Sequence, residues 1–236
     1  MLLGNGALVY WNGISPGGDE EFLSWHVSEH IPERVSIPGF LRGRRYVAHS
    51  GDPRYFNFYE TEKPGVLHSP AYRERLDHPT PWTTKVIATF IDTSRTICRV
   101  VHTQGFGEGA WMQTIRFSFP KAREACIVAL IDLLKALPRR SPLVGAHLLE
   151  GTRSHIEPTR ELELRGHPDE QIDGVILIEA ADQASLEALA GGALAQTTLA
   201  EAGAGTLLRG TYQLQYSLSA DSLSDEKCSS PLKETA

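Results

Sequence analysis

The stretch Ala7-Leu8-Val9-Tyr10-Trp11, followed by Asn12-Gly13 and Ser15-Pro16-Gly17-Gly18, opens the pattern that decides the fold. Five apolar or aromatic residues in a row predict a buried strand, and the glycines and prolines predict where it ends. A helix is expected next, because the acidic run 19–21 places negative charge where the helix dipole favours it. Pro38-Gly39 predicts that this helix has ended before residue 40.

The pattern continues to residue 101. Strands are expected at 40–48 and 55–60, joined through the turn formers Ser50-Gly51-Asp52-Pro53. A helix at 69–76 and a final strand or strand pair at 85–101 follow. The element order is therefore strand, helix, strand, strand, helix, strand.

Residues 110–218 repeat this order with different side chains. The expected strands are 111–119, 143–150, 174–180 and 206–218, and the expected helices are 121–137 and 184–195. We predict an α+β fold of two tandem ferredoxin-like βαββαβ units, packed as an intrachain pseudo-dimeric α+β barrel with the helices outside.

Turn-forming residues at 103–109 mark the boundary between the two halves. We predict a ferredoxin-like unit with a candidate pocket at 1–104, a degenerate ferredoxin-like unit at 105–218, and a disordered polar tail at 219–236. The connection 151–173 is long for a hairpin loop, which predicts either a flap or a mobile segment.

Composition excludes several classes of partner. A net charge of -6 and a pI of about 5.8 give no field that attracts nucleic acid or an anionic membrane surface. Residues 1–6 contain neither a basic run nor a long apolar run, so we expect no signal peptide, no membrane anchor and a cytoplasmic protein. The basic cluster Arg42, Arg44 and Arg45 lies in an expected strand, where alternation divides it between two faces as solvated or salt-bridged residues.

Cofactor and metal sites are not indicated. Cys98, Cys126 and Cys228 are far apart and odd in number, as expected of reduced thiols rather than of a metal or redox motif. The chain also contains no Walker loop, dinucleotide fingerprint, GxSxG elbow or HExxH motif. We therefore expect no cofactor.

The first expected helix contains the candidate catalytic residues. On a helical wheel His26 and His30 fall in the middle of the apolar arc, so both imidazoles should face the sheet, where burial lowers the pKa of histidine. They are candidate catalytic acids or bases, and the alternative is a pair of core histidines bonded to sheet hydroxyls or carbonyls. A shared metal is disfavoured because no third ligand has helical spacing. The corresponding helix of the second half, 122–137, contains no histidine.

Aromatic residues gather in the same half. Residues 1–105 hold 13 Phe, Trp and Tyr residues against 6 in residues 106–236, which assigns the pocket to the first unit. On the strand at 55–60, one face carries Tyr55, Asn57 and Tyr59 and the other carries Phe56 and Phe58, and alternation alone does not say which face lines the pocket. The candidate binding residues are Trp25, Tyr46, Tyr59 and Trp82. Their alternative role is packing in two apolar cores.

Three short motifs carry a family resemblance. Trp25-x4-His30-x-Pro32, Pro38-Gly39-Phe40 and Arg44-Arg45-Tyr46 resemble the dimeric α+β barrel superfamily, particularly EthD-like proteins and, functionally, antibiotic-biosynthesis-monooxygenase-like proteins. The resemblance implies a small-molecule ligand and a cofactor-independent monooxygenase, cyclase or isomerase acting on a small hydrophobic or aromatic compound. His30 matches the helix histidine of that superfamily.

Two other classes share the architecture. One is a non-catalytic ligand-binding or structural barrel. A protein of any of these classes could form a homo-oligomer. The other is a haem-binding chlorite-dismutase-like protein, whose haem histidine lies in the second unit. His147, His155 and His167 are available there, but none lies on an apolar helix face.

Overall fold

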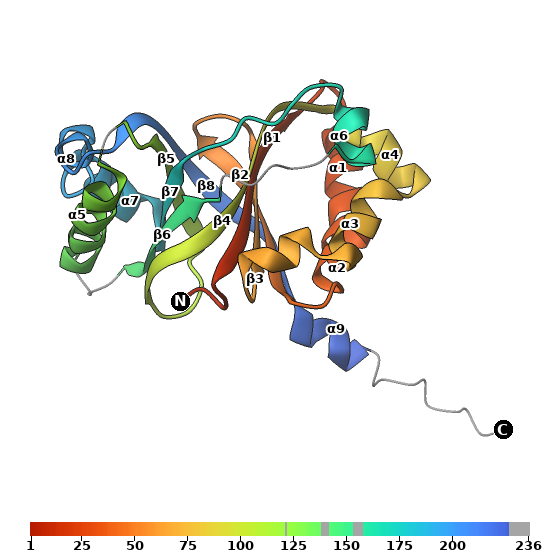
Figure 1. Cartoon of the computed structure of the whole chain (residues 1–236), viewed down its shortest axis with the longest axis horizontal. Coiled ribbons are helices and arrows are strands. Elements are labelled where there is room, and N and C mark those ends of the chain that lie inside the picture. The colour runs from red at the N-terminus through yellow and green to blue at the C-terminus, as the bar shows by residue number, and fades with distance from the viewer. Residues whose placement is uncertain (121, 138–141, 153–157, 227–236) are drawn as a thin grey trace.

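The computed structural model describes residues 1–120, 122–137, 142–152 and 158–226, and within them eight strands form a closed antiparallel barrel. The strands are β1 (Gly6–Ile14), β2 (Phe40–Ser50), β3 (Tyr55–Thr61), β4 (Phe90–Gly105), β5 (Trp111–Ser118), β6 (Leu143–Gly151), β7 (Gly174–Ala180) and β8 (Gly205–Ser219). Their order around the barrel is β1-β3-β2-β8-β5-β7-β6-β4 (Figure 1). The predicted α+β class with an antiparallel barrel is thus confirmed.

Both halves of the chain arrange their strands in the same order. The first half reads β4-β1-β3-β2 and the second reads β8-β5-β7-β6, so each places its fourth strand beside its first and its third beside its second. The halves meet at two seams, where β2 pairs with β8 and β4 pairs with β6. Closure at both seams leaves no barrel strand with an unpaired edge.

The helices cover the outside of the barrel in two groups (Figure 1). The first group is α1 (Asp19–Trp25), the π-helix η1 (His26–His30), α2 (Ile31–Val35), the 3-10 helix η2 (Pro64–His68), α3 (Pro70–Asp77), α4 (Pro81–Ile87) and α6 (Arg160–Arg165). The second group is α5 (Arg123–Ala136), α7 (Gln183–Gly191) and α8 (Gln196–Glu201), and α9 (Ala220–Glu226) follows β8. Although α6 belongs to the second half of the chain, it lies with the first group, beside α3 and α4.

Two expected boundaries are wrong. Residues 85–87 belong to α4 rather than to the last strand of the first half, because Thr80 caps a helix that begins at Pro81. The Thr80 side-chain oxygen accepts from the Thr83 backbone N–H at 3.0 Å, and proline suits the first turn because it has no N–H to satisfy. The predicted disordered tail at 219–236 also starts too early, because residues 220–226 form α9 and Leu223 packs against the core beneath α2 and α3. Residues 227–236 lie outside the described part of the chain.

The barrel interior decides which strand face points where. Phe56 and Phe58 point inside and pack with Trp11, whereas Tyr55 and Tyr59 point outward to the helices. The outward face of β3 is therefore the one that can line a pocket beside the first helix.

The basic cluster of β2 is divided between the two faces, as expected, but it is buried rather than solvated. Arg44 lies inside the barrel, 0% exposed, with ion pairs of 3.0 Å to Glu60 and 3.2 Å to Glu179. Arg42 also pairs with Glu60, at 2.6 Å. Arg45 points outward and donates to the Leu23 carbonyl at 3.3 Å. Each buried guanidinium is tolerated inside because it is paired or hydrogen-bonded.

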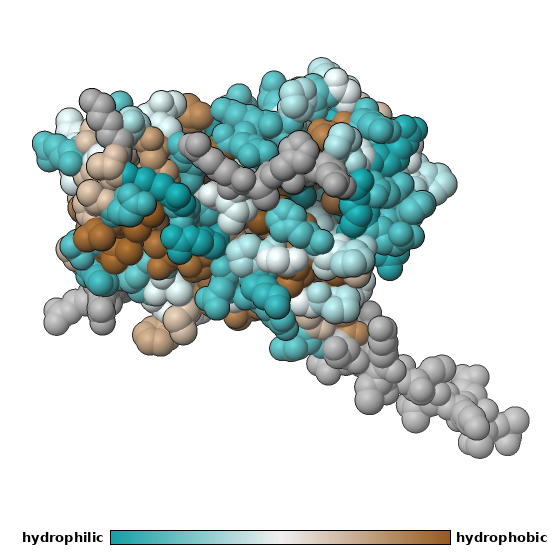
Figure 2. Space-filling model, viewed as in Figure 1, coloured by the Kyte–Doolittle hydropathy of each residue, from teal (hydrophilic) through white to brown (hydrophobic). Residues whose placement is uncertain are grey.

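The molecular surface differs between the two ends. Figure 2 shows a mostly hydrophilic surface at the end that carries the first helix group and apolar surface at the end where α5 lies. Val128 of α5 is 59% exposed. None of the helices in the described residues is long and apolar enough to cross a membrane.

Candidate functional site

The histidine helix is interrupted by a π turn at the two histidines. α1 ends at Trp25, the five residues of η1 follow, and α2 resumes at Ile31. Pro32 has no N–H to donate to the carbonyl four residues earlier, which weakens the α-helical bond pattern at this point. The wider turn stacks the imidazoles of His26 and His30, with ring centroids 5.2 Å apart and planes 19° apart. π turns of this kind occur frequently at functional sites.

His26 is buried against the sheet. It is 2% exposed, its Nε2 lies 3.2 Å from the Tyr59 hydroxyl, and its ring stacks on Phe22 at 5.1 Å. Burial lowers the pKa of His26 well below the usual value, and the positive charges of Arg45 and Arg34 lower it further. The imidazole is therefore neutral near pH 7. Its Nδ1 is buried without a hydrogen-bond partner among the described residues.

His30 lies four residues further along the helix and is partly exposed. Its ring packs on Trp25 at 4.3 Å and meets the Tyr59 ring edge-on at 6.3 Å. Burial of the ring, with Arg34 beside it, lowers the pKa of His30 well below the usual value as well. Its Nδ1 is also buried, with no partner in the part of the chain that the structure describes. Each of the two neutral imidazoles thus has a ring nitrogen without a hydrogen-bond partner among the described residues.

A cavity of about 30 Å³ lies beside His30, between the helices and the outer face of the sheet. This is room for roughly one water molecule. Its aromatic walls are Tyr10, Phe40, Tyr59, Tyr72 and Phe90. Its polar walls are His30, Arg34, Arg95, Glu161 and Arg165.

The second half of the chain covers this cavity through α6. Glu161, which is 5% exposed, forms an ion pair with Arg34, and Arg34 also pairs with Glu33 at 2.6 Å. Further along, the Asp169 carboxylate accepts from the Thr93 hydroxyl of β4 at 2.8 Å. The described part of the 151–173 connection is therefore docked on the first half and completes the wall of its cavity, whereas residues 153–157 lie outside the described chain.

The structure brings four of the six predicted site residues together. His26 and His30 contact each other, and both contact Trp25 and Tyr59 through ring packing or a hydrogen bond. His30 and Tyr59 line the cavity. Trp25 is held behind His30 by a 3.1 Å bond from its Nε1 to Thr83.

The other two predicted residues lie elsewhere. Tyr46 points into the barrel, on the face of the sheet opposite to the cavity, with its ring 5.7 Å from Phe56. Trp82 lies on α4, where its Nε1 donates to Glu21 at 2.7 Å, and it packs beside the site without lining the cavity.

Sequence reasoning missed the charged wall of the cavity. Arg34 follows His30 at i+4, the spacing at which helix neighbours share a face, and that signal was available. Arg95 pairs in register with Tyr10 of β1, which needs the sheet order to be known. Glu161 lies in the insertion and carries no local signal.

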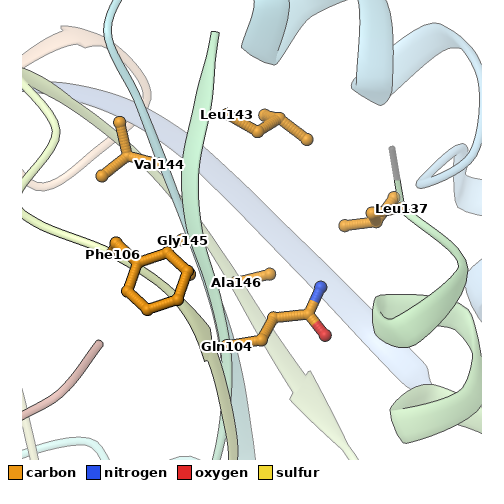
Figure 3. A pocket seen from close by; sticks show the side chains of 8 residues that line it. Gln104, Phe106, Leu137, Leu143, Val144, Gly145 and Ala146 are labelled. Carbon is orange, nitrogen blue, oxygen red and sulfur yellow. The ribbon is translucent and has the colours of Figure 1, made fainter. Parts of the chain in front are cut away.

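A larger pocket of about 350 Å³ lies in the second half, between the end of α5 and β6 (Figure 3). Its walls are mostly apolar, and the Gln104 amide that enters it already donates to the Leu134 carbonyl at 2.7 Å. No titratable side chain lines it among the described residues. We assign no chemistry to it.

The second half does not present a haem ligand within the described residues. The core beneath α5, α7 and α8 is apolar and contains no histidine there. His147 points into the barrel and bonds to Thr103 at 2.8 Å, and His167 lies 3.4 Å from the Phe90 carbonyl. His155 is outside the described residues. The residues present thus do not fit a haem held between these helices and the sheet.

Comparison with known proteins shows the fold. No family model and no curated protein matches the chain. An anthrone oxidase-like protein superposes with a TM-score of 0.63 at 14% identity, covering 91% of this chain and 92% of its own. A proposed monooxygenase from Fusobacterium nucleatum gives 0.59 at 8% identity, covering 92% and 96%. A chlorite dismutase from Candidatus Nitrospira defluvii gives 0.53 at 11% identity, covering 95% of each chain. At these identities the likeness is one of fold alone.

Proposed function

We propose that the chain, which shares its fold with the dimeric α+β barrel proteins, belongs to that superfamily and binds a small aromatic compound beside His30. There it acts by cofactor-independent acid–base chemistry as a monooxygenase, cyclase or isomerase. The observation that carries the proposal is the pair of neutral imidazoles, each with a buried and unpartnered Nδ1, next to a cavity walled by aromatic rings. The shared strand order of the two halves supports two tandem ferredoxin-like units as the scaffold.

The chemistry follows from the protonation states. A neutral imidazole accepts a proton from an acidic C–H or O–H of a bound ring, and its lowered pKa keeps His30 in this unprotonated form at physiological pH. His30 is the base because it lines the cavity. His26 is a positioning residue, since it stacks on His30 and is itself fixed by Tyr59. The guanidinium of Arg34 lies in the same wall and favours the negative charge that forms on the substrate.

Substrate entry requires a change at α6. The present cavity holds about 30 Å³, which is too little for an aromatic ring. The cover is held by the Arg34–Glu161 pair and a 2.8 Å bond from Arg73 to the Pro158 carbonyl, and Leu164 of α6 packs on the apolar core of the first half. Outward movement of α6 would break these contacts and leave the sheet and its pairing intact.

The test is a screen of aromatic and β-keto compounds, followed by oxygen uptake and product analysis. We expect His30→Ala to lower turnover by roughly 10²–10⁴-fold with little loss of fold, the usual effect of losing a general base. His78→Ala is the matched control, because that side chain is 71% exposed and outside the site. A structural His30 would instead show a loss of about 1–3 kcal/mol of unfolding free energy with ligand retention unchanged.

A non-catalytic ligand-binding barrel is the second candidate, supported by the same enclosed aromatic walls. Ligands that bind and are never converted, in the wild type and in His30→Ala alike, would favour it. A Soret band in the purified protein would contradict both functions. Cytoplasmic location and a homo-oligomeric state stay predictions, and light scattering of the full chain tests the second.

A further inference from the structure

Arg95 is a buried cation that lacks a carboxylate partner. It is 7% exposed, lies on β4 opposite Tyr10 of β1, and lines the cavity. Its Nη2 donates to the Tyr72 hydroxyl at 2.9 Å. Among the residues that the structure describes, no Asp or Glu oxygen lies within ion-pair distance of it.

The other two arginines of the cavity are neutralised. Arg34 pairs with Glu161 and Glu33, and Arg165 pairs with Asp169 at 2.8 Å. A buried charge is costly unless it is paired, so Arg95 is the cavity arginine that an anionic ligand would stabilise most.

An unused hydroxyl faces the same space. Tyr10 is 9% exposed, it lines the cavity, and its hydroxyl is buried without a hydrogen-bond partner in the described residues. Burial raises the pKa of Tyr10, so the hydroxyl keeps its proton and can donate. A guanidinium and a phenol donor together form a binding site for an anionic oxygen.

We propose that the cavity selects an aromatic compound with an anionic oxygen, a carboxylate or a phenolate, held by Arg95 and the Tyr10 hydroxyl. This rests on the proposed function and names the substrate class of that same site. With the anionic group held at Arg95, the ring lies against the aromatic walls and another part of the compound faces His30.

Glu161 works against such a ligand. Its carboxylate is the one cavity-lining acid of the described residues, and α6 brings it there from the second half of the chain. An incoming anion meets like-charge repulsion from Glu161 and attraction from Arg95. Glu161→Gln should therefore raise the affinity for an anionic ligand and leave that for a neutral one nearly unchanged.

The experiment is calorimetric titration of the full chain with three probes: benzoate, 4-nitrophenolate and neutral benzamide. The two anions test the carboxylate and phenolate sources separately. We expect at least one to bind roughly tenfold or more tightly than benzamide, and Arg95→Gln to abolish that preference, since a charge-assisted bond is worth about that factor or more. Arg54→Gln is the matched control, because its side chain is 57% exposed and outside the cavity.

Further variants keep the result interpretable. If Arg95→Gln fails to fold, Arg95→Lys should keep the preference in weakened form, and Tyr10→Phe should reduce it severalfold without changing the charge. Three outcomes would overturn the proposal: all three probes bind equally, the preference for an anion survives in Arg95→Gln, or no probe binds. Equal binding together with His30-dependent turnover leaves the proposed function standing. If no probe binds and no compound is turned over, both the anionic-ligand proposal and the proposed function are contradicted.

Discussion

The histidine pair His26 and His30 predicts a steep loss of stability in mild acid. Burial lowers the pKa values of His26 and His30 in the folded chain, with Arg34 and Arg45 facing them, whereas both titrate near 6.5 when unfolded. Below about pH 6.5 the unfolded chain therefore binds more protons, and the unfolding free energy falls as pH falls. The stabilisation is fully present above the unfolded pKa and is lost below it.

The size follows from the number of protons. Each buried neutral histidine contributes a slope of about 1.2–1.4 kcal/mol per pH unit below the unfolded pKa, so the pair costs about 2.5 kcal/mol between pH 6 and pH 5. Burial lowers the pKa of His147 inside the barrel too, which adds to the loss. Glu33, whose pKa is raised by burial, acts in the opposite direction at the acid end of this range.

Urea unfolding at pH 7, 6 and 5 measures this slope. His26→Gln and His30→Gln should each remove about half of the pair's contribution, because glutamine does not titrate and remains able to hydrogen-bond. His78→Gln serves as the control, since that side chain is 71% exposed. The contrary result would be a site variant that keeps the wild-type dependence of unfolding free energy on pH between pH 6 and pH 5. That result would show that burial does not hold the imidazole neutral, and it would contradict its assignment as a neutral base.

Three further outcomes test the packing around the site and the barrel. Tyr59→Phe should lower the unfolding free energy by about 1–3 kcal/mol, because the buried Nε2 of His26 loses its partner; a melt equal to wild type would contradict this. Arg44→Met should cost about 3–5 kcal/mol in urea unfolding, because two buried glutamates lose a cation, and a neutral effect would mean that water replaces it. Cys98 is 0% exposed and its pKa is raised by burial, so a thiol reagent should modify it only in denaturant; rapid labelling of the native protein would refute this.

The repeated element order was readable from sequence because it depends on local pattern. Apolar runs bounded by Gly and Pro located the barrel strands to within a few residues, and 174–180 coincides with β7. The missed helices α4, α6, α8 and α9 have seven residues or fewer, and α4 begins at a Thr-Pro pair that also reads as a break. Where caps and turns use the same residues, only tertiary packing decides between them.

Only the site residues that lie together on one helix could be predicted from the sequence. The wheel placed His26 and His30 toward the sheet, although the π turn between them depends on tertiary contacts that no wheel contains. Tyr46 was assigned to the wrong side because alternation gives two faces without saying which one is inside the barrel. Arg95 and Glu161 were missed because the sheet order and the docking of α6 bring them to the cavity from distant parts of the chain.

The path of α6 has an evolutionary reading. Two identical chains that closed such a barrel would be bound by symmetry to carry the same residues at both ends, so every change in one site would be repeated in the other. Joining the halves in one chain releases that constraint. Here the histidines lie in the helix of one half, the corresponding helix α5 of the other half carries alanine and leucine, and that other half contributes the segment that covers the cavity. In this arrangement the ligand specificity of related proteins could change through the covering segment α6, without changes to the barrel.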